Sequence, residues 1–314
     1  MNVLVFGGLG FVGSNFVNWC APNRPGWNLK IVDGFTYAAD RNRIYKDLDI
    51  EIRKSRLETP EKYTDLVKWA DFIVNFAAET HNDNSLRDPK PFLESNVNGV
   101  FELLKVCTAH QTKLIQISTD EVYGDFPLES SDAADENYPF RPSSPYSSTK
   151  AAGDLMVMAW VRSFKLNAIV THCTNNFGPG QHQEKLIPTI ISSVRMGLPI
   201  RLYGNGENTR DWIHVDDHSA AVALLIEKGK MGERYNIGAN NHITNVELAK
   251  RISSELESEN QIIEFIEDRP GHDLKYSIDS AKIKDLGWQP DSTQKAMSTG
   301  IVASLKASEW EQKT

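Results

Sequence analysis

The stretch NVLVFGGLGFVGSN, residues 2–15, decides the fold. An apolar run at 2–6 ends at Gly7, and Gly10 and Gly13 follow before a segment with helical spacing. Glycines between a strand and a helix let the backbone turn tightly and approach a pyrophosphate, which the helix N-terminus then stabilises. The spacing is GxxGxxG and departs from the commoner GxGxxG. In this context it still predicts a dinucleotide-binding loop.

Short apolar runs alternate with amphipathic segments through the first half of the chain. Runs with few charges, typical of buried parallel strands, occupy 2–6, 29–33, 71–77, 113–118 and 167–173. Segments with helical spacing lie between or after them, at 12–20, 95–107 and 147–164. This alternation predicts right-handed βαβ units and an α/β fold with a Rossmann-type, doubly wound parallel sheet.

The second half has a different rhythm. Turn signals crowd 175–212, a strand that leads into a helix is expected at 213–229, and a helix at 245–256. We therefore expect a dinucleotide-binding domain and a smaller, C-terminal substrate domain, each built from two stretches of chain. The first domain takes 1–174 and 211–239, and the second takes 175–210 and 240–314, with a frayed end at 308–314.

Composition excludes several classes of protein. A net charge of −8 on 314 residues argues against a nucleic-acid surface, which needs clustered Lys and Arg. No apolar stretch reaches the length of a membrane span, and no spacing suggests a metal site. The cysteines, Cys20, Cys107 and Cys173, are far apart in apolar runs and are expected to be buried free thiols. Free thiols without an export signal predict a cytoplasmic protein.

Asp33 ends the second predicted strand. An acid at this place accepts hydrogen bonds from the ribose hydroxyls of the dinucleotide and repels a 2′-phosphate, so NAD is favoured over NADP. The alternative is that Asp33 only caps the loop that follows.

Two motifs carry the candidate chemistry. In PYSSTKAA, 145–152, Tyr146 and Lys150 lie one helical turn apart, and an ammonium beside the phenol is expected to lower the phenol pKa and make Tyr146 a usable base. In STDEVYG, 118–124, Asp120 and Glu121 could serve as an acid and a base at neighbouring atoms. The alternative for this pair is a helix cap and a first-turn acid.

Motifs along nearly the whole chain resemble those of the dTDP-glucose 4,6-dehydratases, which belong to the extended short-chain dehydrogenases/reductases. They are GGLGFVGSN, AAETHND (77–83), STDEVYG, YSSTKA, NNFGPGQHQEKLIP (175–188), YGNGENTRDWIHVDD (203–217), YNIG (235–238), RPGHD (269–273) and LGWQP (286–290). The resemblance implies a lyase that oxidises a sugar nucleotide at C4 with NAD, eliminates water and returns the hydride to C6. The acidic pair is the most diagnostic part, since related epimerases typically carry a small hydroxyl residue there.

The resemblance also implies roles for individual residues. Thr119 would hold the sugar 4-hydroxyl, Tyr146 would take its proton, Asp120 would protonate the departing 6-hydroxyl, and Glu121 would remove the C5 proton and later return it. The implied NAD-binding residues are Gly7, Gly10, Phe11, Val12, Gly13, Asp33, Thr36, Ala77, Ala78, Thr80, Tyr146, Lys150 and Asn176. The implied substrate-binding residues are Thr80, Thr119, Asn175, Lys185, Leu186, Tyr203, Arg210, Asn236, Arg269 and His272. Arg210 could equally belong to a structural ion pair.

The resemblance further implies a homodimer in which the helices at 95–107 and 147–164 pack against their copies. Four positions depart from the usual pattern, namely Asn82, Asn84, His172 and Phe177. Three alternatives stay open: the same reaction on another sugar nucleotide such as UDP-glucose, a sugar-nucleotide 4-epimerase, and a non-catalytic NAD-sensing protein, which would not need Tyr146, Lys150 and the acidic pair together.

Overall fold

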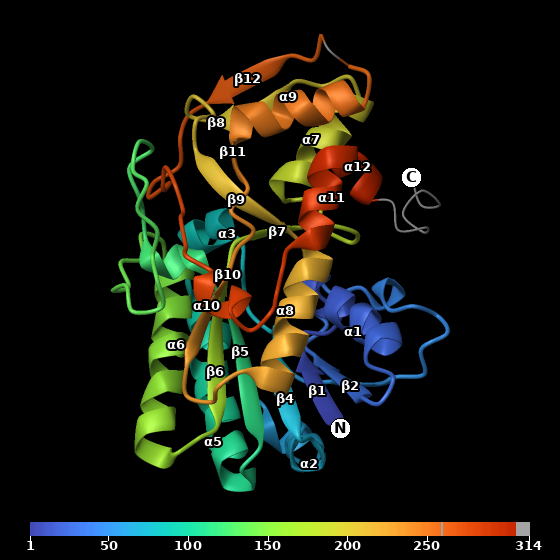
Figure 1. The fold of residues 1–314 in the computed structure, drawn as a ribbon, viewed down its shortest axis with the longest axis vertical. Coiled ribbons are helices and arrows are strands. Elements are labelled where there is room, and N and C mark those ends of the chain that lie inside the picture. Colours follow the sequence, from blue (N-terminus) through green and yellow to red (C-terminus); the bar gives the residue numbers. More distant parts are fainter. Residues whose placement is uncertain (259, 306–314) are drawn as a thin grey trace.

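A seven-stranded parallel sheet forms the centre of the computed structural model, which describes residues 1–258 and 260–305 (Figure 1). Its order is β10-β6-β5-β4-β1-β2-β3. The strands are β1 (Asn2–Phe6), β2 (Asn28–Asp33), β3 (Glu51–Lys54), β4 (Phe72–Asn75), β5 (Lys113–Thr119), β6 (Ala168–Cys173) and β10 (Arg234–Ile237). The predicted doubly wound fold is confirmed. Its strand order changes direction between β1 and β4, where such sheets bind ligands at their carboxyl edge.

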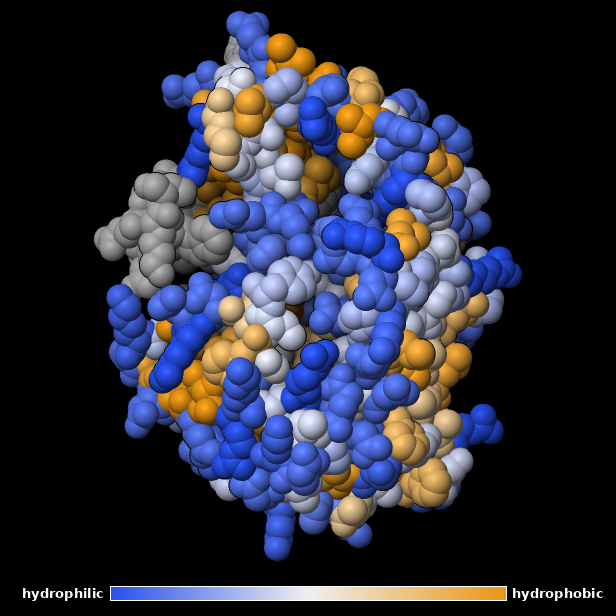
Figure 2. Space-filling model, turned by 180° about the vertical axis from the view of Figure 1, so that it is seen from behind, coloured by the Kyte–Doolittle hydropathy of each residue, from blue (hydrophilic) through white to orange (hydrophobic). Residues whose placement is uncertain are grey.

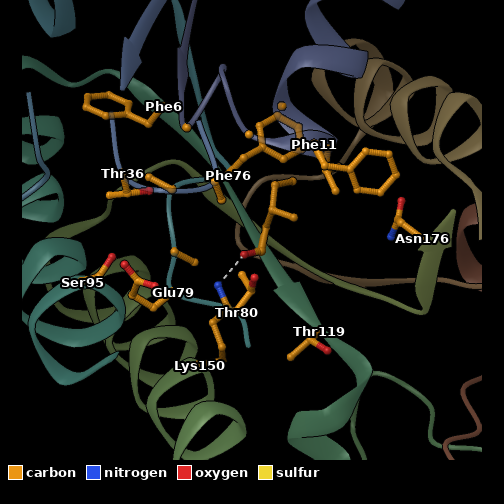
Figure 3. A pocket seen from close by; sticks show the side chains of 18 of the residues that line it. Phe6, Phe11, Thr36, Phe76, Glu79, Thr80, Ser95, Thr119, Lys150 and Asn176 are labelled. Carbon is orange, nitrogen blue, oxygen red and sulfur yellow. Dashed lines mark hydrogen bonds between the residues drawn. The ribbon is translucent and has the colours of Figure 1, made fainter. Parts of the chain in front are cut away.

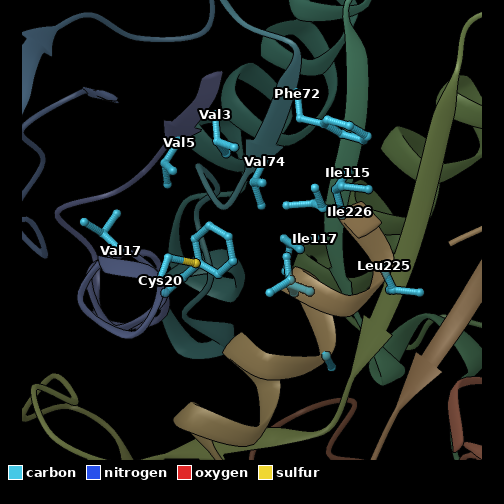
Figure 4. Packing of buried hydrophobic residues seen from close by; sticks show 14 of the residues in the cluster. Val3, Val5, Val17, Cys20, Phe72, Val74, Ile115, Ile117, Leu225 and Ile226 are labelled. Atoms are coloured by element: carbon cyan, nitrogen blue, oxygen red, sulfur yellow. The ribbon is translucent and has the colours of Figure 1, made fainter. Parts of the chain in front are cut away.

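Helices cover both faces of this sheet. On one face lie α1 (Phe11–Asn23) and α8 (Val215–Lys228), and on the other lie α2 (Thr64–Trp69), α5 (Val100–His110) and α6 (Pro145–Phe164). Successive side chains of a strand point to opposite faces. Val3 and Val5 of β1 therefore pack against α1 and α8, as Figure 4 shows for that core, whereas Leu4 and Phe6 pack on the other side.

A smaller part lies beyond the carboxyl edge of the sheet (Figure 1). It holds a three-stranded sheet of β7 (Asn175–Phe177), β9 (Thr209–His214) and β11 (His242–Thr244), and a two-stranded sheet of β8 (Ile200–Tyr203) and β12 (Ile263–Ile266). Its helices are α7 (Leu186–Arg195), α9 (Asn245–Glu255), α11 (Asp291–Thr299) and α12 (Ile301–Ser304). One core joins Phe177, Ile187 and Leu202 to Leu248 and Ile252, so two separate stretches of chain share it.

The division into two domains stays a prediction, but the sheets show where its segments lie. Residues 211–214 belong to β9 in the small sheet, whereas α8 packs against the large sheet and β10 is one of its strands. The predicted frayed end, 308–314, lies outside the described residues. No helix within 1–258 and 260–305 is both long and apolar enough to cross a membrane.

Short elements complete the chain and position the site. They are η1 (Arg41–Arg43), η2 (Pro60–Lys62), α3 (Asn82–Arg87), α4 (Lys90–Leu93), a π-helical turn η3 (Glu94–Gly99), η4 (Asp120–Tyr123) and α10 (Ala281–Lys284). The helix predicted at 95–107 thus begins as the π-helical turn and continues as α5.

Candidate active site

A cleft lies at the carboxyl edge of the sheet, where the loops after β1, β2, β4 and β5 meet the residues that follow β6. Figure 3 shows side chains from these loops around the cleft, with Thr119 and Lys150 on one side and Phe11 and Asn176 on the other. The cleft therefore joins the glycine loop to the residues of the STDEVYG and PYSSTKAA motifs.

The glycine loop has the close packing that a dinucleotide cradle needs. Gly7 has a φ of +71°, and a Cβ there would lie 2.6 Å from the backbone nitrogen of Ala77. A Cβ on Gly13 would lie 2.3 Å from the carbonyl oxygen of Gly7. No side chain caps the N-terminus of α1, so its first amide groups are free to bind an anion. These residues fit the pyrophosphate of a dinucleotide.

Asp33 is buried at the end of β2 and lines the cleft. Its Oδ2 accepts a hydrogen bond from the Leu9 amide at 2.9 Å, and its Oδ1 accepts one from the Phe35 amide at 2.8 Å. Burial raises the pKa of this carboxyl, and the two amides oppose the rise. Asp33 thus does hold its loop, yet each carboxylate oxygen keeps lone pairs for further donors.

Asp33→Ala should weaken the binding of NAD more than that of NADP, because NAD loses an acceptor whereas NADP loses a repulsion. Asp33→Asn removes the charge and keeps one acceptor oxygen, so it should raise the affinity for NADP relative to that for NAD. Fluorescence titration of both cofactors measures the ratio. Equal affinity of the unmodified chain for NAD and NADP would contradict the assignment of Asp33.

Thr119, Asp120 and Glu121 stand at the end of β5, where the chain turns into η4. Thr119 caps η4, since its Oγ1 accepts a hydrogen bond from the Glu121 amide at 3.3 Å and donates to Asp120 Oδ1 at 3.3 Å. Asp120 is 2% exposed, and its Oδ2 has no partner among the described residues. Burial raises the pKa of Asp120 well above its ordinary value, and the charges of Glu121 and Asp211 add to the rise. The enclosed position of Asp120 therefore favours the protonated form of its carboxyl group.

Asp120→Asn should stabilise the fold even though it removes that acid. The folded-state pKa lies above 3.8, the ordinary value, so the folded chain holds a proton that the unfolded chain releases. Stability of the unmodified chain therefore falls as pH rises from that value toward the folded-state pKa. The gain of the variant should grow by at most about 1.4 kcal/mol per pH unit.

Urea unfolding at several pH values measures this gain in the free energy of unfolding. Asp132→Asn, which removes one carboxylate from an exposed position, controls for the change in net charge. An Asp120→Asn variant no more stable than the unmodified chain at neutral pH would show that Asp120 is not held protonated.

Glu121 is half-buried beside Asp120 and lines the same cleft. Its Oε2 accepts a hydrogen bond from Asn82 Nδ2 at 2.9 Å and lies 3.4 Å from the hydroxyl of Tyr276. The two neighbouring carboxyl groups therefore have different surroundings: Asp120 is enclosed, and Glu121 is held by hydrogen-bond donors. Different surroundings are what two carboxyl groups need in order to take opposite acid and base roles.

Tyr146 and Lys150 lie on the first turns of α6. Ser144 caps the N-terminus of this helix and forms a capping box with Ser147. Both side chains are buried, and Lys150 Nζ donates to the carbonyl oxygen of Ile117 at 2.8 Å, the dashed line in Figure 3. Burial raises the pKa of Tyr146 well above 10, and the charge of Glu121 adds to the rise. The predicted lowering of this pKa by Lys150 is not seen in the chain by itself, where burial raises the pKa.

A buried polar network lies next to Lys150 and contains His172, one of the four positions that depart from the family pattern. Asp154, one turn further along α6, accepts a hydrogen bond from Ser118 Oγ at 2.5 Å and lies 3.4 Å from His172 Nε2. His172 Nδ1 lies 2.8 Å from the hydroxyl of Tyr123. The charge of Asp154 opposes the lowering that burial imposes on the Lys150 pKa, so this network helps to keep the ammonium charged.

Every residue predicted to bind NAD or to be catalytic lines this cleft, and so do Asn175 and Lys185 of the predicted substrate set. Further lining residues were not predicted: Ser55, Arg56, Leu57, Glu58, Glu79, Ser95, Cys173, Gln181, His182, Glu184 and His218. The first four follow β3, whose sequence EIRK is too charged to stand out as a strand. A further strand is expected after β2 in a βαβ pattern, and this expectation could have predicted β3 and the four residues that follow it.

Comparisons with known proteins agree with this arrangement. The family model described as GDP-mannose 4,6 dehydratase matches residues 4–299. A dTDP-glucose 4,6-dehydratase of Mycolicibacterium smegmatis is 43% identical over 295 residues, which cover 93% of this chain and 89% of that protein. The chain belongs to the dTDP-glucose 4,6-dehydratase family.

Two solved structures have a similar fold, one of a dehydratase and one of an epimerase. The dTDP-glucose 4,6-dehydratase DesIV of Streptomyces venezuelae, solved with NAD and TYD bound, has a TM-score of 0.91 and 35% identity over 97% of this chain and 96% of that chain. A UDP-glucose 4-epimerase of Thermus thermophilus, solved with NAD, has a TM-score of 0.83 and 26% identity over 92% of this chain and 94% of that one. The fold is thus common to dehydratases and epimerases, so the fold alone does not separate these two activities.

Three predicted substrate residues of this dehydratase lie together outside the lining of the cleft. Arg269 forms an ion pair with Asp83 of α3 at 3.0 Å, and the Tyr203 hydroxyl donates to the other Asp83 oxygen at 3.0 Å. The rings of Tyr203 and His272 are 5.9 Å apart, and His272 pairs with Asp268 at 2.6 Å. The structure therefore groups these three residues around α3.

The remaining predicted substrate residues of the dehydratase have other surroundings. Arg210 is 6% exposed, donates to the carbonyl oxygens of Thr209, Asp273 and Leu274, and stacks on Tyr276. Among the described residues it forms no ion pair, so the alternative of a structural pair with Asp211 is not seen. Asn236 is fully buried; its amide bonds to Tyr123, Ala134 and Asp279. Leu186 begins α7, and neither Leu186 nor Asn236 lines the cleft.

Proposed function

We propose that this chain catalyses the 4,6-dehydration of dTDP-glucose, giving dTDP-4-keto-6-deoxyglucose and water. The observation that carries the proposal is the pair Asp120 and Glu121 in one cleft with Tyr146 and the glycine loop. Oxidation alone would need Tyr146 and Lys150 but no acidic pair. Elimination of water needs an acid and a base at neighbouring atoms, which this pair supplies.

The residues around the glycine loop fit NAD. The loop and the N-terminus of α1 would hold the pyrophosphate, Asp33 and Thr36 the ribose, and Ala77, Ala78 and Asn176 the remainder. When bound, NAD supplies a hydride acceptor that also serves as the hydride donor of the last step, and its oxidised nicotinamide ring carries a positive charge.

Thr119 and Tyr146 handle the proton of the sugar 4-hydroxyl. Thr119 holds this hydroxyl with its own, and the Tyr146 oxygen takes the proton as C4 becomes a ketone. Burial makes the Tyr146 phenolate costly, so the ammonium of Lys150 on the same helix and the positive charge of the ring are the charges available to stabilise it.

Asp120 and Glu121 handle the protons of the elimination. The proton on C5 becomes acidic once C4 is a ketone, and Glu121 removes it. Asp120, which burial keeps protonated, gives its proton to the 6-oxygen, which leaves as water. Glu121 then returns a proton to C5. The enclosed position of Asp120 keeps bulk water from that carboxyl group.

The group of Tyr203, Arg269 and His272 around Asp83 supports a site for the nucleoside diphosphate, together with Lys185 and Asn175 in the cleft. Arg is suited to phosphate because its guanidinium donates two parallel hydrogen bonds. In this chain Arg269 already bonds to a carboxylate, Asp83, which a phosphate would have to replace or share.

A turnover assay with dTDP-, UDP- and GDP-hexoses, read by product mass, tests the function. We expect dTDP-glucose to give a product lighter than the substrate by one water, with no lasting NADH. Turnover with UDP-glucose and not with dTDP-glucose would mean that the enzyme runs the same reaction on a sugar nucleotide with a different nucleobase. An unchanged product mass would indicate an epimerase, and no turnover of any sugar a non-catalytic protein.

We also propose that the enzyme is a homodimer through α5 and α6. Phe101, Leu155 and Phe164 are exposed on these helices, and the ring of Trp160 lies 5.8 Å from that of Phe101 and 5.2 Å from that of Phe164. In Figure 2 apolar side chains gather at the lower right, the side on which α6 lies. Contiguous exposed apolar surface of this kind is typical of subunit interfaces.

Leu155→Glu should convert the dimer to a monomer, since it places a charge at an exposed apolar position of α6. Light scattering during gel filtration measures the mass of each species. Met196→Glu, at an exposed apolar residue on the far part of the molecule, is the control. A monomeric unmodified chain would contradict the dimer.

The free cysteines support the cytoplasm as the compartment of this enzyme.

A further inference from the structure

We infer that Asn82 is a positioning residue for the elimination step: its side-chain amide holds one oxygen of Glu121, so that the other oxygen is the base that takes the C5 proton. The inference rests on the role of Glu121 in the proposed function. It concerns a residue outside the predicted site and outside the lining of the cleft.

The contact joins two loops at the carboxyl edge of the sheet. Asn82 is the first residue of α3, after β4, and Glu121 lies in η4, after β5. These two strands are hydrogen-bonded neighbours, so the loops after them meet. Asn82 Nδ2 donates to Glu121 Oε2 at 2.9 Å, a distance typical of a good hydrogen bond to a carboxylate.

A second neighbour lies at the same oxygen. The Tyr276 hydroxyl is 3.4 Å from Glu121 Oε2 and 2.8 Å from Asp273 Oδ2. Tyr276 is buried and stays a neutral phenol, because burial raises its pKa well above 10. Its one proton is shared between two carboxylates, so Asn82 is the closer and dedicated donor to Glu121.

This arrangement distinguishes the two oxygens of Glu121. Both contacts are to Oε2, and among residues 1–258 and 260–305 no group donates to Oε1. A bond to one oxygen fixes the rotation of the carboxylate, and the free oxygen keeps its lone pairs for a proton. A general base must be held within hydrogen-bond reach of the proton that it abstracts, so this fixing contributes to the rate.

Folding does not explain Asn82. Its Oδ1 is buried and has no partner among the described residues, and a buried polar atom without a partner is destabilising. The orientation of the amide follows from Glu121, since the reverse orientation would bring two acceptors together. An apolar side chain of similar size would serve the fold at least as well, but could not hold the carboxylate.

Asn82→Leu tests the inference in a single turnover with dTDP-glucose. NADH should form at the native rate, because Thr119, Tyr146 and Lys150 are unchanged. The exchange of the C5 hydrogen for solvent deuterium, followed by rapid-quench mass spectrometry, should slow by roughly 10- to 100-fold through the lost charge-assisted bond. The melting temperature should not fall. Asn84→Leu makes the same change on the same helix without touching Glu121, and should leave the exchange unchanged.

Asn82→Asp adds a second measurement, the pH dependence of C5 exchange, which a purely structural role of Asn82 would leave unchanged. Two carboxylates at this distance share one proton, so the new carboxylic acid regains a donor as the pH falls. Exchange at C5 should therefore recover toward acidic pH in this variant and in no other. Tyr276→Phe, which removes the second neighbour, should slow the exchange less than Asn82→Leu does.

Native exchange rates in Asn82→Leu would overturn the inference. So would an equal slowing of NADH formation and exchange together with a lower melting temperature, since that pattern marks a structural residue. Failure of the unmodified enzyme to dehydrate any sugar nucleotide would instead reject the proposed function, so the two failures are distinguishable.

Discussion

The double variant Asp120→Asn, Glu121→Gln should stop halfway through the reaction. Thr119, Tyr146 and Lys150 remain, so the sugar 4-hydroxyl can still be oxidised. The ketone then lacks both the base for C5 and the acid for the 6-oxygen, and loss of water should slow by ~10²–10⁴-fold, the usual contribution of a general acid or base. Enzyme-bound NADH and a 4-keto sugar that keeps its 6-hydroxyl should accumulate in a single turnover.

Rapid-quench mass spectrometry combined with NADH absorbance follows both species. The unmodified enzyme is the reference and should show only brief NADH absorbance and a product lighter by one water. The two single variants separate the roles: Glu121→Gln should block deuterium exchange at C5, whereas Asp120→Asn should permit exchange but not loss of water. A double variant that dehydrates at the native rate would remove these residues from the mechanism.

Tyr146→Phe should abolish oxidation and leave substrate binding intact. The hydroxyl is lost, while the ring still fills its buried position beside Phe92. The loss in the rate of NADH formation should be ~10²–10⁴-fold. Stopped-flow absorbance measures that rate, and titration with dTDP, the nucleotide part of the substrate, measures binding.

Tyr203→Phe is the matched control for this change. It removes a phenol hydroxyl outside the cleft, so it should weaken nucleotide binding without slowing oxidation of bound sugar. Near-normal oxidation by Tyr146→Phe would exclude Tyr146 as the base. Unlike the acidic double variant, Tyr146→Phe should not accumulate NADH, because oxidation itself is slowed, so the two variants order the steps of the reaction.

The sequence was a good guide wherever local pattern decides structure. The apolar runs of β1, β2, β4, β5 and β6 and the glycine spacing follow from steric and burial rules that act over a few residues. For the same reason the order of these strands was enough to group the residues at their carboxyl ends into one cleft. The charged edge strand β3 and the short β10 lacked such a pattern, so the sequence did not predict them as strands.

Long-range contacts explain the other differences. The pKa of Tyr146 depends on how much protein surrounds the phenol, which spacing along a helix does not report. Asn236 looks like a polar ligand in sequence, yet its amide is enclosed by groups from distant segments. The bond from Asn82 to Glu121 likewise joins residues of different loops, and only the pairing of β4 with β5 brings them together.

The core shared by two stretches of chain has a consequence for how the protein is made. Phe177, Ile187 and Leu202 leave the ribosome well before Leu248, Ile252 and the helices α11 and α12 that cover them. Most of the large sheet can form while the chain is growing, since domains tend to fold as they are synthesised. Until then the apolar side chains of Phe177, Ile187 and Leu202 lack their later packing partners. This interval is when the nascent chain is most exposed to aggregation, and when a chaperone would have the most to bind.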